Sequence, residues 1–155
     1  MMKSAPPGRW LPLLAAPGVI FLLGSAAAVI TALDIPTFIK QNGPGPGIPA
    51  TRLRAATALP ISQEPLQVDA TDVVYTTFTG EAGNVVDTVL TSPAATAIID
   101  QTTKHQIFRG NSTVLLKRPD LEASGEQWSY EYISKTDCTI VINKNARVVY
   151  YGLFK

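Results

Sequence analysis

The stretch WSYEYISKTDCTIVINKNARVVYYG, residues 128–152, decides the fold that the sequence predicts. Trp128, Tyr130 and Tyr132 alternate with smaller or polar residues, and a period of two puts successive side chains on opposite faces of a strand. The pattern predicts strands over 128–134, 138–143 and 147–154. Lys144-Asn145 fits a hairpin turn between the last two strands, because asparagine tolerates positive φ.

Upstream, residues 112–117 also alternate and predict another strand, followed by a polar loop, RPDLEASGEQ, over 118–127. Short links between consecutive strands favour an antiparallel meander. Residues 66–91 are rich in Val and Thr and fit strands, although Asp72 to Phe78 also fits a short helix. We expect a sheet of three to four strands.

Two helices are expected between these strands. Ser92-Pro93 is typical of a helix start and Gly110 of a helix end. The apolar positions change face near Asp100-Gln101, which predicts a break and a second short helix from Thr103. One or two helices would cover the aromatic face of the sheet, so residues 66–155 are predicted to form a small α+β domain.

Five aromatic residues are the candidate partner-binding set. Tyrosine and tryptophan are enriched in protein interfaces because each combines a large apolar area with a polar tip. Core packing explains one strand face, but neighbouring Tyr150 and Tyr151 must point to opposite sides, so at least one is expected to face solvent or a partner. The candidates are Trp128, Tyr130, Tyr132, Tyr150 and Tyr151.

The sequence offers little catalytic chemistry. His105 and Cys138 are the only histidine and the only cysteine, which excludes the ligand sets of ordinary zinc sites and an internal disulfide. A nucleophilic Cys138–His105 pair is formally possible. Cys138, however, alternates with Ile140 and Ile142 like a buried strand residue, and His105 is expected on an exposed helix face. We predict no enzyme activity, no cofactor and no metal.

The charge distribution argues against nucleic acid as a partner. The net charge is +1, but residues 66–155 carry eight Lys or Arg against ten Asp or Glu. The basic patch that would neutralise phosphates is therefore missing from the predicted domain.

Residues 35–65 are predicted to form a linker. They contain six prolines, three of them in the run NGPGPGIP at 42–49, and no periodic apolar residues. Repeated proline favours extended polyproline-like chain, and glycine adds flexible joints.

Residues 11–33 carry no charged side chain. As a helix this segment would be about 34 Å long, enough to cross a bilayer core of about 30 Å. It is predicted to be a membrane anchor within residues 1–34, or else a signal peptide cleaved near Ser25-Ala26-Ala27-Ala28. Lys3 and Arg9 favour a cytoplasmic N-terminus. The expected location is the inner membrane, single-pass, with the C-terminal domain outside the cytoplasm, or alternatively the periplasm after cleavage.

Three short motifs resemble the BamE/SmpA/OmlA family of small envelope domains. They are IIDQTTKHQIFRG at 98–110, WSYEY at 128–132 and INKNARVVYYG at 142–152. The resemblance implies two helices packed on a three-stranded antiparallel sheet and a non-catalytic role in holding other envelope proteins.

The sequence thus predicts a non-catalytic, membrane-anchored envelope protein whose domain binds or scaffolds other envelope or membrane proteins. The alternative is an accessory single-span subunit of a larger membrane complex, in which the small residues of 11–33 allow close packing against other spans.

Overall fold

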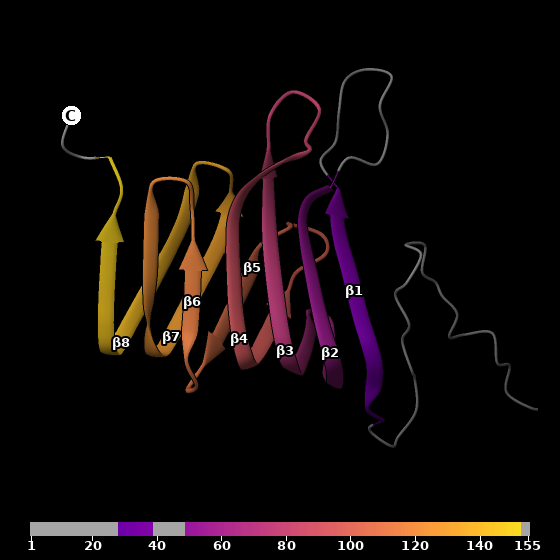
Figure 1. The fold of residues 1–155 in the computed structure, drawn as a ribbon. Coiled ribbons are helices and arrows are strands. Elements are labelled where there is room, and N and C mark those ends of the chain that lie inside the picture. The colour runs from indigo at the N-terminus through magenta and orange to yellow at the C-terminus, as the bar shows by residue number, and fades with distance from the viewer. Residues whose placement is uncertain (1–27, 39–48, 153–155) are drawn as a thin grey trace, which may run out of the picture.

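The computed structural model describes residues 28–38 and 49–152, which form one antiparallel sheet of eight strands and contain no helix. Figure 1 labels the strands and colours them in chain order. They are β1 (Ile30–Phe38), β2 (Pro49–Gln63), β3 (Leu66–Thr79), β4 (Val85–Ile99), β5 (Gln106–Gly110), β6 (Val114–Lys117), β7 (Leu121–Ser134) and β8 (Asp137–Tyr150).

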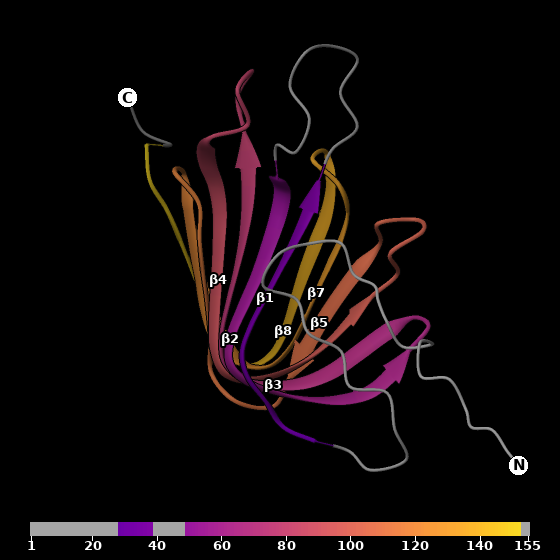
Figure 2. The same ribbon diagram turned by 90° about the vertical axis from the view of Figure 1, so that its right-hand side faces the viewer.

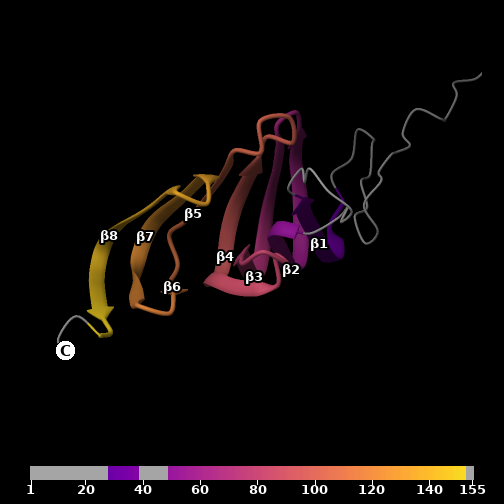
Figure 3. The same ribbon diagram turned by 90° about the horizontal axis from the view of Figure 1, so that it is seen from above.

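The short strands β5 and β6 share one position in the sheet. Both lie between β4 and β7, β5 beside the end of β4 and β6 beside its middle. The remaining neighbours follow chain order, from β1 to β4 on one side and from β7 to β8 on the other. The strands β1 and β8 are therefore the two edges of the sheet, and Figure 3 shows them at its opposite ends.

Tyr75 on β3 and Phe108 on β5 lie in contact because the sheet folds over on itself. The pairings align Phe108 with Ala97 on β4, and Ala97 with Val68 on β3. Val68 lies seven residues before Tyr75, about 23 Å along a straight strand. The two ring centroids are nevertheless 4.3 Å apart. The strands must therefore bend between these rows and bring two halves of the sheet face to face (Figure 2). We call them the β5 half and the β6 half after the short strand that each contains. The β5 half also holds residues 66–71 of β3, 94–99 of β4 and 128–134 of β7, and the β6 half holds residues 73–79, 85–92 and 121–125 of the same strands.

The bend passes through residues that fit positions where the backbone hydrogen bonds between strands are interrupted. Asp72 on β3 has a φ of 50° and stands opposite Pro93 on β4, between the pairs Thr71–Ala94 and Val73–Ser92. Proline has no N–H to donate, so it is tolerated inside a sheet only where the ladder is broken. Gln127 on β7 also has a positive φ, of 53°, beside an irregularity in the β7–β8 register.

The hydrophobic core fills the space between the two halves. On β3 the buried residues are Leu66, Val68 and Ala70 before the bend, then Val73 and Tyr75 after it. The alternation of inward and outward side chains thus slips by one residue at Asp72, which keeps both halves apolar on the inner face. The same slip occurs on β4 and β7. The buried residues of β4 are 88, 90 and 92 before the slip and 95, 97 and 99 after it. Those of β7 are 123 and 125 before the slip and 128, 130 and 132 after it.

The predicted α+β fold is wrong, because the described chain is all-β. Ser92 and Pro93 lie within β4, Thr103 lies in the turn after it, and Gly110 ends β5. Ala95, Ala97 and Ile99 point into the core while Thr96 and Ile98 do not, which is the period of a strand. Antiparallel pairing agrees with the sequence-based expectation, but the strand number and the covering helices do not. The BamE-like α+β domain is contradicted by the same finding.

Two local predictions near the C-terminus are also corrected. The expected polar loop over 118–127 is mostly strand, because β7 begins at Leu121. The expected hairpin at Lys144-Asn145 is absent, since β8 continues through both residues. Asn145 does have a positive φ, of 53°, but at the irregular register opposite Gly125 and Glu126 instead of in a turn.

The predicted linker at 35–65 contains the end of β1 and the whole of β2. Its prolines fit these strands for local reasons. Pro36 lies on the edge strand β1, Pro49 begins β2, and Pro60 lies at a register shift, which are positions that need no N–H donor. Residues 39–48 lie outside the described residues.

The predicted membrane helix at 11–33 is contradicted at its C-terminal end, where Ile30 to Leu33 belong to β1. Residues 1–27 lie outside the described part of the chain. Within residues 28–38 and 49–152, no helix is long and apolar enough to cross a membrane. These findings correct the predicted single-pass location in the inner membrane and the transmembrane anchor; periplasmic location after cleavage stays a prediction.

Candidate functional site

The two edges of the sheet differ in how well they are protected. Edge strands expose unpaired N–H and C=O groups, and proteins block them with proline, charge and irregular backbone. β1 has nine residues and carries Asp34 and Pro36, and Ala32 has a φ of 65°. β8 has fourteen residues and, among the described strands, pairs only with β7. Its first part, Cys138 to Asn143, contains neither charge nor proline.

The core is closed at the β1 edge and open at the β8 edge. On β1 the inward side chains of Ile30, Leu33, Ile35 and Thr37 are at most 9% exposed. On β8 the inward side chains are those opposite the buried residues of β7. Cys138, Ile140 and Ile142 are partly buried against the core, but Val148 is 49% exposed and Tyr150 is 59% exposed. The apolar layer therefore extends to this edge, and no described residue covers it.

The outer face of β8 also carries an apolar side chain between Cys138 and Asn143. Val141 stands opposite Ser129 on β7 and is 46% exposed. Basic charge begins only beyond the segment, at Lys144 and Arg147. Residues 138–143 thus expose backbone N–H and C=O groups that no other described strand pairs with, between apolar side chains on both faces. We call residues 138–143 the β8 edge segment.

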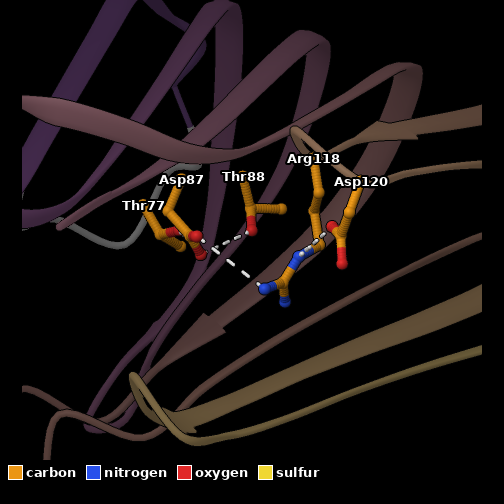
Figure 4. Close-up of polar contacts among 5 residues, drawn as sticks. All are labelled: Thr77, Asp87, Thr88, Arg118 and Asp120. Carbon is orange, nitrogen blue, oxygen red and sulfur yellow. Dashed lines mark hydrogen bonds and ion pairs between the residues drawn. The ribbon is translucent and has the colours of Figure 1, made fainter. Parts of the chain in front are cut away.

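A polar cluster lies on the β6 half, at the end where this half meets the β5 half. Thr77 and Thr88 donate hydrogen bonds to Oδ2 of Asp87, at 3.4 and 3.0 Å. Arg118 Nη2 lies 3.8 Å from Asp87 Oδ1, and Arg118 Nε lies 3.6 Å from Asp120 Oδ1. Figure 4 shows the guanidinium between the two carboxylates. Both ion pairs are longer than a direct hydrogen bond.

The β5 half supplies two tyrosines and a thiol opposite this cluster. Tyr130, Tyr132 and Cys138 line a cavity of about 70 Å³ together with Asp87 and Arg118. Burial raises the pKa of Tyr130 well above its usual value, and the neighbouring Cys138 raises it further. Burial likewise raises the pKa of Tyr132. The Tyr130 hydroxyl has no hydrogen-bond partner among the described residues, so its contact with Cys138 lacks hydrogen-bond geometry.

The structure divides the five aromatic candidates into two groups. Trp128, Tyr130 and Tyr132 belong to the core. Tyr150 is exposed at the open edge, and Tyr151, also exposed, donates a backbone hydrogen bond to Asp120 O at 2.9 Å. The structure does not bring the five into one surface. Sequence reasoning missed Ile140, Val141 and Val148 as candidates, although the uncharged run Cys138 to Asn143 was a usable signal for the first two.

The only histidine and the only cysteine occupy different settings. His105 precedes β5 instead of lying on a helix, and its Nε2 lies 2.6 Å from Glu131 Oε1. Cys138 is on β8 in the row that joins Gln106 and Tyr132 across the strands. In the described ranges no group of three His, Cys, Asp or Glu side chains could hold a metal ion.

Comparisons with protein-family models, with curated proteins and with solved structures find no match.

Proposed function

We propose that this protein is a non-catalytic binding protein that holds another protein by accepting one of its strands along the β8 edge segment. The observation that carries the proposal is the uncovered end of the core at β8. The identity of the partner as another envelope protein stays a prediction from the sequence.

Strand addition suits this edge for two reasons. A peptide that pairs with residues 138–143 gains main-chain hydrogen bonds from groups that have no partner strand, and alternate side chains supply specificity. Its inward side chains would also cover Ile140 and Ile142, which are only partly buried. Full burial of an exposed apolar side chain contributes roughly 1.5–3 kcal/mol, and covering a partly buried one contributes a fraction of that.

The geometry also specifies the partner strand. To extend the sheet, the partner strand needs apolar residues at every second position, where the side chains face the core. Its side chains on the outer face, beside Val141, are less restricted. β-Branched and aromatic residues meet this requirement, because they pack well on a pleated surface. A strand with proline or alternating charge would not fit.

Site-specific photo-crosslinking in the native host tests the proposal. A photoreactive residue at Val141 should give a discrete adduct, and the same residue at Val86 should not. Val86 is the matched control because it is the same residue type with nearly equal exposure, 47%, on β4.

A charge variant supplies the second arm. Val141→Lys should abolish the complex on a native gel and in co-purification, because a lysine on an edge strand opposes pairing. Val86→Lys should leave the complex intact, and both variants should unfold at the same temperature as the wild type. An adduct that forms equally from both positions, or a complex that survives Val141→Lys, contradicts the proposal.

A further inference from the structure

We infer that the cavity lined by Arg118, Lys135, Tyr130 and Tyr132 binds a phosphate group. This inference is independent of the proposed strand addition, because it concerns the space between the two halves of the sheet and not the outer edge of β8.

Groups that donate hydrogen bonds dominate the lining. Arg118 and Lys135 carry only donors. The Tyr130 hydroxyl is buried and has no partner in the described chain, which is costly unless a ligand accepts from it. The one carboxylate of the cavity, Asp87, already accepts hydrogen bonds from Thr77 and Thr88. An occupant must therefore supply acceptors.

The two cations are available to such an occupant. Arg118 stands 3.8 Å from Asp87 and 3.6 Å from Asp120, too far for direct hydrogen bonds, so its N–H groups can still donate. Lys135 takes part in none of the ion pairs found among the described residues. Arg118 is shared between Asp87 and Asp120, and Lys135 adds a positive charge at the cavity that no ion pair among the described residues offsets.

The size of the cavity selects a compact ligand. A volume of about 70 Å³ is only a few times the roughly 10–15 Å³ that a cavity needs to hold a single water. A phosphate group has five heavy atoms and four acceptor oxygens, whereas a carboxylate offers only two oxygens to the guanidinium, the ammonium and the two phenols. Any larger remainder of the ligand would have to stay outside the cavity.

Titration of the full chain with inorganic phosphate, followed by amide chemical shifts, tests the inference. We expect saturable shifts confined to residues that line the cavity, such as Thr77, Thr79 and Lys135. Arg118→Gln should weaken binding at least about tenfold, since a charge-assisted hydrogen bond is lost. Tyr130→Phe, which removes only the hydroxyl, should weaken binding by about two- to tenfold.

Lys117→Gln is the matched control. Lys117 adjoins Arg118 in sequence, is exposed, and follows the inward Leu116, so it points to the outer face. If this variant weakens binding as much as Arg118→Gln, the affinity comes from diffuse charge and the inference is wrong. Circular dichroism and thermal unfolding of each variant confirm that it is folded before its affinity is compared.

A second arm separates two sources of the phosphate group. Phosphatidylcholine vesicles with and without phosphatidic acid present a phosphate monoester on a lipid. Arg118-dependent binding of inorganic phosphate supports a soluble ligand, and Arg118-dependent binding only to the phosphatidic acid vesicles supports a headgroup. Failure of both probes, or binding that Arg118→Gln leaves unchanged, overturns the inference.

Discussion

Gln106 Nε2 donates a hydrogen bond to Thr51 Oγ1 at 2.9 Å, across 55 residues of sequence. The pairings align Gln106 with Ile99, Leu66 and then Gln63 on β2. Gln63 lies twelve residues from Thr51 on that same strand, about 40 Å along a straight chain. This hydrogen bond therefore joins the ends of the two halves of the sheet and closes the fold near β1.

Replacement of Gln106 should loosen this closure. Gln106 also donates to Thr37 Oγ1 and accepts from Thr51 Oγ1, and all three residues are buried. Gln106→Ala leaves two buried hydroxyls without a partner and opens a cavity, so urea unfolding should show a loss of about 2–4 kcal/mol. Gln101→Ala, at an exposed turn residue, should change stability by less than about 0.5 kcal/mol. Equal stability of both variants would contradict the closing role.

The sequence could predict the strands whose alternation is unbroken. Trp128, Tyr130 and Tyr132 share one face of β7, and Cys138, Ile140 and Ile142 share one face of β8, as their spacing indicates. The bend, in contrast, is a tertiary feature. At Pro93 and Asp72 the alternation of buried and exposed residues slips by one residue. The sequence of one long strand therefore lacks the unbroken period of two that would identify it. Ser92-Pro93 followed by Ala-rich sequence then resembles a helix start.

The candidate site could not be predicted for a related reason. Residues of the cavity are brought together only when the sheet folds over, as with Thr77 and Tyr132, which belong to different halves. The exposure of Val148 depends on its edge position, and period two alone predicts it to be as buried as Ile35. The strand order makes both β1 and β8 edges, and only the burial of their inward side chains distinguishes the closed edge from the open one.

Shortening an inward side chain should have different effects on stability at the closed edge, β1, and at the open edge, β8. Ile35→Ala on β1 removes a buried side chain and should cost about 2–4 kcal/mol in free energy of unfolding. Val148→Ala on β8 removes a half-exposed one and should cost less than about 1 kcal/mol in the isolated protein. Chemical denaturation of the two variants measures the contrast. A large loss for Val148→Ala would mean that this edge is already covered.

Gly110 should tolerate no side chain. A Cβ at this position would lie 2.9 Å from the carbonyl oxygen of Ala94 and 3.2 Å from Trp128 Nε1. Because the first neighbour is backbone, the strand itself must shift, and overpacking of this kind costs about 1–3 kcal/mol. Gly110→Ala should lower the unfolding midpoint accordingly, whereas Asn111→Ala, at the exposed next residue, should not. Unchanged midpoints for both would exclude the predicted clash.

The buried tyrosines should make stability fall at alkaline pH. Burial raises the pKa of Tyr75, Tyr130 and Tyr132 above the unfolded value of about 10. Below that pH both states hold the phenolic protons and the full stability is present. As pH rises above about 10, the unfolded state releases its protons first, and each tyrosine lowers the free energy of unfolding by up to about 1.4 kcal/mol per pH unit until its own folded-state pKa is reached. Urea midpoints measured across this range should therefore decline steeply, and Tyr130→Phe should reduce the slope by one such contribution. A slope that Tyr130→Phe leaves unchanged would show that the Tyr130 phenol ionises no later in the folded chain than in the unfolded one.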